Sequence, residues 1–277
     1  MASSAPPATG WAALSRDVLW SLFTDLGQRE VLSGAGLACA PWRHLARDEP
    51  ALWRRIDLTA AGDDTVPGWK AMALAAIDRS AGQCEAFWGR ADEVLLYLSD
   101  RASSMKSLRL TSSYDVSSKV FAELMKKFPL LEELELVLFK SDAYTTKSKQ
   151  PSNNSWIDLF RSTCEACRHL HHFTVRRTDK ARHYRSYYER EEAERSLKRF
   201  SIPKMHGLHS LELSGGHLTK HLVINIVDNC PSLESLNISD MYLYLDTEEG
   251  KDLRNKCSQI KNLRLPEVYY VENFMVS

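Results

Sequence analysis

The residues best suited to metal chemistry form one short cluster in the middle of the chain. Cys164 and Cys167 are separated by two residues, and His169, His171 and His172 follow directly. A structural zinc site needs four ligands, usually from two paired motifs at a fixed spacing, and only one such pair is present. The repeat described below accounts for the same residues without a metal. We therefore expect no metal and no other cofactor.

A second segment combines positive charge with aromatic rings. Residues 176–188 are rich in Arg and contain Tyr184, Tyr187 and Tyr188, a mixture that can bind nucleic acid or a phosphorylated peptide. Glutamates at four positions within 189–194 follow at once and can pair with basic neighbours along a helix. We favour a solvated loop and helix. Lys and Arg together equal Asp and Glu at 36 each, so the chain lacks the basic excess of a nucleic-acid-binding protein.

No motif for catalysis stands out: the sequence has no glycine-rich phosphate loop and no nucleophile elbow. Its 277 residues are 44% hydrophobic and 26% charged, a globular composition. The first ten residues lack the features of a secretory signal, and no apolar run approaches the ~18 residues of a membrane span. We expect a non-enzymatic, intracellular protein of the nucleus, the cytoplasm or both, with reduced cysteines. Its partners should be proteins, not nucleic acids or membranes.

A repeat dominates the rest of the chain. Six segments share the pattern apolar-x-x-apolar-x-apolar, and they are 105–110, 131–136, 170–175, 208–213, 233–238 and 260–265. Their last apolar positions are 26, 39, 38, 25 and 27 residues apart. Three of these spacings fall within the ~20–29 residues of a leucine-rich repeat, and the other two equal one repeat plus an insertion.

Each repeat predicts a strand followed by a helix. Alternate residues of a strand point to opposite faces, so Leu108 and Leu110 should face a core while Arg109 faces outward. Helical apolar spacing covers 116–128, 156–167 and 222–230, and prolines follow two of these segments. The predicted fold is therefore α/β: a short three-helix unit followed by a solenoid with parallel strands on its concave face and helices on its convex face.

The expected organisation has five parts. They are a disordered tail at 1–10, a helical unit at 11–58, linking helices with a weak first repeat at 59–104, repeats at 105–268 with insertions at 140–155 and 176–199, and a tail at 269–277. Within the second insertion we favour a helix over 187–200. The alternative is a strand over 197–202, but Ile202 lies only 11 residues before Leu213, which leaves no room for the return path of a repeat.

The N-terminal unit contains the most specific motifs. Three short helices are predicted, the first with Ser15 as its N-cap and Gly27 at its end. The elements Leu14-Ser-Arg-Asp-Val-Leu19, Cys39-Ala-Pro-Trp-Arg43 and Asp48-Glu-Pro-Ala-Leu-Trp53 follow one another here. Together they resemble an F-box, although Ser15 and Gly27-Gln28 stand where the family usually has prolines. An F-box followed by leucine-rich repeats resembles the plant F-box/leucine-rich-repeat proteins in particular, and the likeness covers nearly the whole chain.

This resemblance implies a function. In that family the F-box binds a Skp-type adaptor, and through it a cullin, within an SCF-type E3 ubiquitin ligase, while the repeats hold a protein substrate for ubiquitination and degradation. For this chain the implied adaptor-binding residues are Leu14, Val18, Leu19, Leu22, Val31 and Leu32. The implied substrate-binding residues are Arg109, Glu133, Glu135, His172, Ser210, Glu212, Asn237 and Arg264.

An alternative function remains open at this point. Repeat arrays need capped ends, and residues 11–58 would also serve as a three-helix cap. The chain would then be a leucine-rich-repeat scaffold that binds a protein without any role in a ligase. Binding to a Skp-type adaptor separates the two interpretations.

Overall fold

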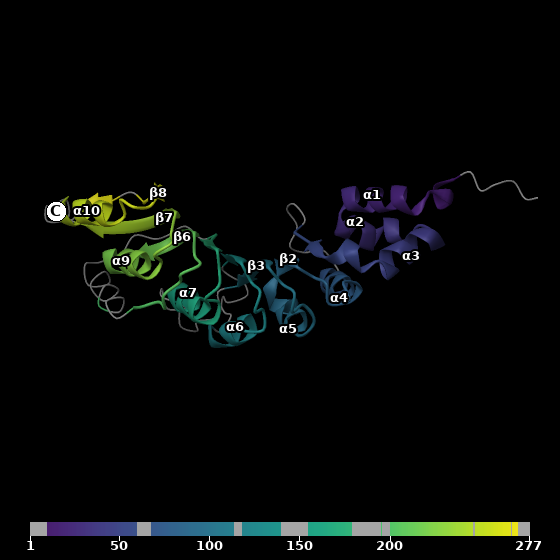
Figure 1. Cartoon of the computed structure of the whole chain (residues 1–277), viewed down its shortest axis with the longest axis horizontal. Helices are drawn as coiled ribbons and strands as arrows, with labels where there is room; N and C mark the ends of the chain where they lie inside the picture. The colour runs from purple at the N-terminus through teal and green to yellow at the C-terminus, as the bar shows by residue number, and fades with distance from the viewer. Residues whose placement is uncertain are drawn as a thin grey trace, which may run out of the picture. The chain divides into compact units, whose positions relative to one another are not determined.

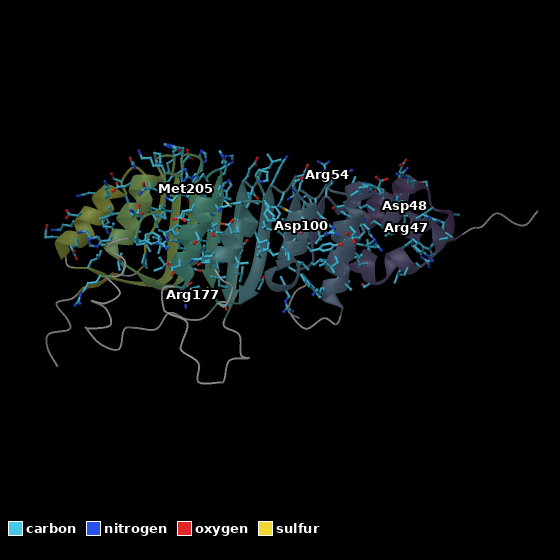
Figure 2. The ribbon with its side chains drawn as sticks, turned by 90° about the horizontal axis from the view of Figure 1, so that it is seen from below. Arg47, Asp48, Arg54, Asp100, Arg177 and Met205 are labelled. Carbon is cyan, nitrogen blue, oxygen red and sulfur yellow. The ribbon has the colours of Figure 1, made fainter. Side chains whose placement is uncertain are left out.

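The structure is a computed structural model that describes residues 10–59, 68–113, 118–139, 155–178, 195, 200–245, 247–266 and 268–270. The chain forms two compact units, Met1–Met105 and Lys106–Ser277. Figure 1 shows the elements in chain order, and Figure 2 adds the side chains. Within the described ranges, none of the helices combines the length and the apolar character that crossing a bilayer demands.

Unit 1 begins with short helices and continues into two strands. Its elements are η1 (Trp11–Ala13), α1 (Arg16–Leu26), α2 (Gln28–Ser33), η2 (Ala35–Leu37), α3 (Ala40–Asp48), η3 (Pro50–Trp53), β1 (Arg55–Asp57), α4 (Trp69–Arg79), β2 (Ala86–Arg90) and α5 (Ala91–Arg101). Strands β1 and β2 are parallel, with Ile56 opposite Phe87. The segment expected to link the helical unit to the repeats thus contains helices α4 and α5 and a strand between them.

Local sequence signals explain the limits of α1. The Ser15 hydroxyl accepts a hydrogen bond from the Val18 N–H at 3.4 Å, which satisfies one of the free amides at the helix start. Gly27 ends the helix with φ = +83°, a conformation that costs glycine nothing. The predicted N-cap and helix end are both confirmed. Pro41 lies in the first turn of α3, where its missing N–H costs no hydrogen bond.

Tryptophans hold unit 1 together. Trp42 packs edge-to-face against Phe23 at a centroid distance of 5.6 Å, and its indole N–H donates to the Trp11 carbonyl at 3.0 Å. Trp53 is fully buried, and its indole N–H donates to the Ala46 carbonyl at 2.9 Å. Each ring therefore contributes apolar area while its one polar atom stays satisfied, so a small helical unit gains a specific core.

Unit 2 is a parallel sheet with helices. Its elements are β3 (Ser107–Ser113), α6 (Ser118–Met125), β4 (Glu133–Phe139), α7 (Ser155–Ala166), β5 (His172–Arg177), β6 (Ser210–Leu218), α9 (Lys220–Asn229), β7 (Ser235–Leu245), α10 (Thr247–Lys256), β8 (Asn262–Arg264) and β9 (Val268–Tyr270). The strands pair in chain order from β3 to β8, and β9 pairs with the far half of β7. In Figure 1, α6, α7 and α9 lie along one side of this sheet. The α/β repeat fold predicted from the sequence is confirmed.

The core of unit 2 is a ladder of apolar side chains in register. The predicted inward positions Leu108, Leu134, Phe173, Leu211, Leu236 and Leu263 stand opposite one another on successive strands. All but the last are buried; Leu263 is 36% exposed on the short strand β8. Phe160 of α7 stacks on Phe173 at a centroid distance of 5.4 Å, so the helical layer seals the same ladder.

Two strands extend further than the repeat pattern predicts. β6 and β7 change direction at Gly215 and Asp240, which have φ of +76° and +52°. Pairing then resumes, with Gly216 opposite Met241 and Leu218 opposite Leu243. Both strands thus gain a second leg, and β9 adds to it. The six-residue repeat pattern used to predict the strands does not extend to these second halves of β6 and β7, so it could not predict them.

The insertions lie mostly outside the described residues. These exclude 140–154, 179–194 and 196–199, so the choice between a helix over 187–200 and a strand over 197–202 falls outside them. Phe200 and Ile202 are described; both are buried, and neither lies in a strand. Nearby, Met205, labelled in Figure 2, is buried and its N–H donates to the Asn229 carbonyl at 2.8 Å.

Truncation of the apolar ladder should destabilise unit 2 strongly. We expect Leu211→Ala to lower the free energy of unfolding by about 2–5 kcal/mol, because it leaves a cavity between β5 and β7 that neighbouring strands cannot close. Leu130→Ala removes the same atoms from a side chain that is 52% exposed and should cost less than about 0.5 kcal/mol. Urea unfolding of both variants measures the difference. Equal effects would contradict a continuous buried ladder.

Candidate protein-interaction surfaces

An apolar stripe runs along the outer side of α1. Leu14, Val18 and Leu22 recur at intervals of four residues; Val18 and Leu22 lie on one side of α1, and Leu14 directly precedes its N-cap, Ser15. Val18 is 50% exposed, and Leu14 and Leu22 are half-buried. We call these three residues the α1 stripe. Leu32 of α2, a fourth predicted adaptor contact, is also half-buried.

The other two predicted adaptor contacts belong to the interior. Leu19 and Val31 are each only 3% exposed, since Leu19 packs on the core side of α1 and Val31 on that of α2. Gly36 shows how tight this region is: a Cβ there would stand 2.6 Å from the Val31 carbonyl oxygen. Leu19 and Val31 therefore pack in the interior and support the surface residues. The residues available for direct contact are the α1 stripe and Leu32.

Further exposed apolar side chains precede and follow the α1 stripe along the chain. Trp11, Leu26 and Leu37 are exposed although all three are large and apolar. Single exposed apolar residues are ordinary on a soluble protein, but several within one short helical unit indicate a surface that a partner covers. Helical spacing alone does not separate exposed from buried apolar positions, so these three residues are absent from the predicted adaptor contacts.

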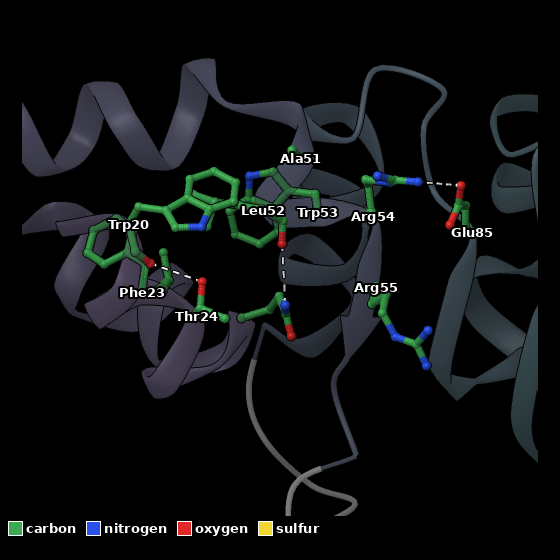
Figure 3. Close-up of a pocket in the computed structure, with 11 residues that line it drawn as sticks. Trp20, Phe23, Thr24, Ala51, Leu52, Trp53, Arg54, Arg55 and Glu85 are labelled. Carbon is green, nitrogen blue, oxygen red and sulfur yellow. Dashed lines mark hydrogen bonds and ion pairs between the residues drawn. The ribbon is translucent and has the colours of Figure 1, made fainter. Parts of the chain in front are cut away.

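A hollow of about 430 Å³ lies between α1, α2, η3 and β1 (Figure 3). Its walls include Trp20 and Phe23, and Gln28 crosses its edge, donating to the Leu52 carbonyl at 3.3 Å and accepting from the Asp57 N–H at 3.4 Å. Trp20 is two residues from Val18, about 200° around the helix, so the hollow and the α1 stripe lie on opposite sides of α1. Its polar groups largely satisfy one another, which favours a structural joint within unit 1.

The sheet of unit 2 presents two polar rows on the side opposite its apolar ladder. The first row is Ser107, Glu133, His172, Ser210, Ser235 and Asn262, and the second is Arg109, Glu135, Thr174, Glu212, Asn237 and Arg264, each in register on β3 to β8. We call this surface the open face. The structure thus brings together every residue that the sequence analysis placed in the substrate-binding set.

A chain of ion pairs crosses the open face. The Arg109 Nε lies 3.3 Å from Glu135 Oε2, and the Arg176 guanidinium lies 3.0 Å from both Glu135 Oε1 and Glu212 Oε1. The hydrogen bond from Arg176 to Glu212, helped by the charges of both carboxylates, raises the pKa of Arg176. We call these four residues the ion ladder. Its two positive and two negative charges cancel, so the ion ladder provides hydrogen-bonding groups without a net charge.

The role of Arg176 differs from the sequence expectation. That residue was assigned to the start of an insertion at 176–199, whereas β5 continues through Arg177 and pairs Arg176 with Val137. Arg177 pairs with Leu138 and is mostly covered, and this burial lowers its pKa. The charged composition that suggested an insertion is here part of the sheet.

Asn237, Glu133 and Arg264 on the open face each carry a polar group without a partner among the described residues. The side-chain oxygen of Asn237 is buried without a hydrogen bond. Glu133 on β4 and Arg264 on β8 are exposed and form no ion pair within the part of the chain that the structure describes. Unsatisfied groups of this kind are suited to contact with a partner.

The Cys–His cluster does not assemble a metal site in the described residues, where no group of three or more potential ligands is placed to hold an ion. Cys164 and Cys167 are buried, while His171 is exposed and meets His209 edge-to-face at 5.6 Å. Burial raises the pKa of the Cys84, Cys167 and Cys230 thiols to about 12. It also raises the pKa of Cys164 and Cys257.

The two units define a class of protein: a mostly helical unit with an exposed apolar stripe, and a leucine-rich-repeat sheet with a polar open face. No model of a known protein family matches the chain. Three proteins of Arabidopsis thaliana resemble it along most of its length. Putative F-box/LRR-repeat protein 23 is 29% identical over 92% of this chain, F-box protein SKIP19 is 28% identical over 95%, and putative F-box/LRR-repeat protein 22 is 27% identical over 93%.

The matched part differs among these relatives. The chain spans about half of the first relative, 53% of its length, and 82% and 77% of the other two. Each alignment includes nearly all of both units described above. Together with the fold, these likenesses support a plant F-box/leucine-rich-repeat protein.

The ion ladder should make a small, salt-dependent contribution to stability. We expect Arg176→Met to lower the free energy of unfolding by about 0.5–1 kcal/mol in dilute buffer and by much less in 1 M NaCl, because salt screens exposed charges. Arg168→Met, at an exposed position just after α7 with no ion pair among the described residues, is the control and should show no salt dependence. A salt-independent effect of Arg176→Met would contradict an electrostatic role.

Thiol reactivity should separate Cys39 from the other cysteines. Cys39 is half-buried and the remaining five are buried with raised pKa values, so their thiolate fraction at pH 8 is very small. Iodoacetamide at pH 8 should modify Cys39 alone in the folded chain and all six cysteines after unfolding. Mass spectrometry of Cys39→Ser should then find no modification of the folded chain; rapid labelling of Cys164 or Cys167 would contradict the buried core.

Proposed function

We propose that the chain is the substrate-recognition subunit of an SCF-type cullin-RING E3 ubiquitin ligase. In this proposal residues 11–58 of unit 1 are the F-box that docks a Skp-type adaptor, and unit 2 binds the protein substrate. The observation that carries it is the α1 stripe: apolar side chains exposed on the N-terminal helices of a chain that is similar to proteins named as F-box proteins.

Adaptor binding is assigned to Leu14, Val18, Leu22 and Leu32. Stable protein interfaces are built around apolar anchors that become desolvated on binding, and unit 1 offers such anchors beside a well-packed interior. Ser15 and Gly27 support this geometry, since they set the start and the end of α1 without the prolines of typical F-boxes. The stripe is therefore formed before any partner arrives.

Substrate binding is assigned to the open face. Its exposed groups are polar and charged, which suits a specific and reversible partner better than a permanent one. The chain itself supplies no catalytic group in this proposal: ubiquitin transfer belongs to other subunits of the ligase. The relatives' names support an F-box protein, and the repeat sheet supports a protein ligand.

Capture of a purified plant Skp-type adaptor tests the proposal. The wild-type chain should retain the adaptor, and Val18→Asp combined with Leu22→Asp should weaken retention at least about tenfold, because two carboxylates would have to be desolvated in the interface. Leu19→Asp is unsuitable here, since Leu19 lies in the core and its substitution would unfold unit 1.

A matched control is Val120→Asp, which places the same charge on an exposed apolar residue of α6 in unit 2. This variant should bind the adaptor like wild type, and circular dichroism should show the same helical content for all chains. If the wild-type chain does not bind the adaptor, the proposal fails and the interpretation as a repeat scaffold without a ligase role takes its place.

A further inference from the structure

The charges on the open face are unevenly distributed. The ion ladder is neutral as a unit, because Arg109 and Arg176 are balanced by Glu135 and Glu212. The charges that stay unbalanced therefore decide what the surface attracts. A charged side chain without an ion pair can bind a partner directly. A charged side chain that is already in an ion pair loses part of that interaction when it binds the partner.

Two strands of the rows, β4 and β8, carry opposite unbalanced charges. On β4, Glu133 is exposed and has no ion pair among the described residues. On β8, Arg264 is exposed and likewise unpaired in the described part of the chain. Beside Arg264, Lys261 is neutralised by Glu234 at 3.0 Å and adds no net charge.

The remaining charges at the β4 end cancel. Lys106 and Glu132 lie next to one another just before β3 and β4, where the Glu132 N–H donates to the Lys106 carbonyl at 2.9 Å. Their side chains have opposite signs, so Glu133 sets the net charge at this end. The open face is consequently acidic at β4, neutral across the ion ladder and basic at β8.

The sheet register gives the separation of the two charges. β4 and β8 are four strand spacings apart in the pairing order, and Glu133 and Arg264 lie on adjacent rows. At about 4.8 Å per strand and 3.3 Å per residue, the two side chains are on the order of 20 Å apart. An extended peptide covers that distance with roughly six residues.

Asn237 lies on the line between them. It stands between Glu212 and Arg264 in the second row, and its side-chain oxygen is buried without a donor among the described residues. An amide side chain offers both a donor and an acceptor, which matches the N–H and C=O of an extended main chain. A peptide that crosses the rows would relieve this unsatisfied group if the side chain of Asn237 turned outward.

From these observations we propose that the open face recognises an extended segment of a partner protein that carries one basic and one acidic side chain about five to seven positions apart. The basic side chain meets Glu133, the acidic side chain meets Arg264, and the main chain between them passes over the ion ladder and Asn237. This inference names the substrate class of the open face, and it rests on the proposed function for the statement that the segment belongs to a ligase substrate.

Synthetic peptides test the spacing. Fluorescently labelled 14-residue peptides with a Ser/Thr/Gln background would carry one Arg and one Glu separated by two to ten positions, in both orders, and fluorescence anisotropy would measure their binding to the full chain. Affinity should peak at five to seven positions, about fivefold above a spacing of two, and the peak should disappear at high salt. Absence of binding, or affinity independent of spacing, overturns the inference.

Single charge reversals test the assignment of each end. Glu133→Lys should transfer the preference from the Arg/Glu peptide to a Glu/Glu peptide of the same spacing, and Arg264→Glu should transfer it to an Arg/Arg peptide. The control Glu123→Lys makes the same change on an exposed residue of α6 and should keep the Arg/Glu preference. Unchanged preferences in both reversed variants would overturn the assignment.

Adaptor capture with the same variants keeps the two proposals apart. Glu133→Lys and Arg264→Glu should both retain the Skp-type adaptor. If the adaptor binds but no peptide preference exists, the inference on the open face fails while the ligase role stands. If the spacing preference is found and the adaptor does not bind, the open face recognises the charged segment, but the protein has no ligase role.

Discussion

The structure of unit 2 depends on one constraint: each strand must bury its apolar side against the next strand in register. Leu108, Leu134 and Phe173 meet in this way on successive strands, and a shift by a single residue would turn every apolar side chain to the solvent. The register that protects the core also fixes the opposite face. The polar rows, the ion ladder and the spacing of about 20 Å between the unbalanced charges all follow from it. Leu263 is exposed on β8, which among the described residues pairs with β7 on one side only. Its exposure shows how much a strand's apolar side chain depends on neighbouring strands for burial.

In unit 1, buried tryptophans form the core instead of a ladder of aligned strand residues. Trp42 and Trp53 bury large rings and satisfy their indole N–H groups on backbone carbonyls, so short helices acquire a defined core. With the interior closed, apolar side chains such as Val18 remain outside. The two units thus offer different surfaces. An apolar stripe suits a partner that stays bound, and a polar, charged sheet suits partners that are selected by sequence and released.

Much of this architecture could be predicted from the sequence because it depends on local patterns. Apolar alternation predicted the repeat strands, Ser15 and Gly27 predicted the limits of α1, and alternate strand positions predicted the polar rows. Features that join distant segments could not be predicted. Arg176 looked like part of an insertion because its pairing with Glu135 and Glu212 depends on three strands, and the second legs of β6 and β7 depend on Gly215 and Asp240. Leu19 and Val31 fitted the apolar pattern, which cannot separate buried positions from contact positions.

The central claim is that unit 1 receives the adaptor while the open face of unit 2 stays free for another protein. Hydrogen–deuterium exchange of the full chain, with and without a purified plant Skp-type adaptor, tests this most directly. The account predicts slower exchange in residues 14–37 when the adaptor is present, and unchanged exchange in β4 to β8. Protection that appears on the strands of unit 2, or no protection in unit 1, would contradict it.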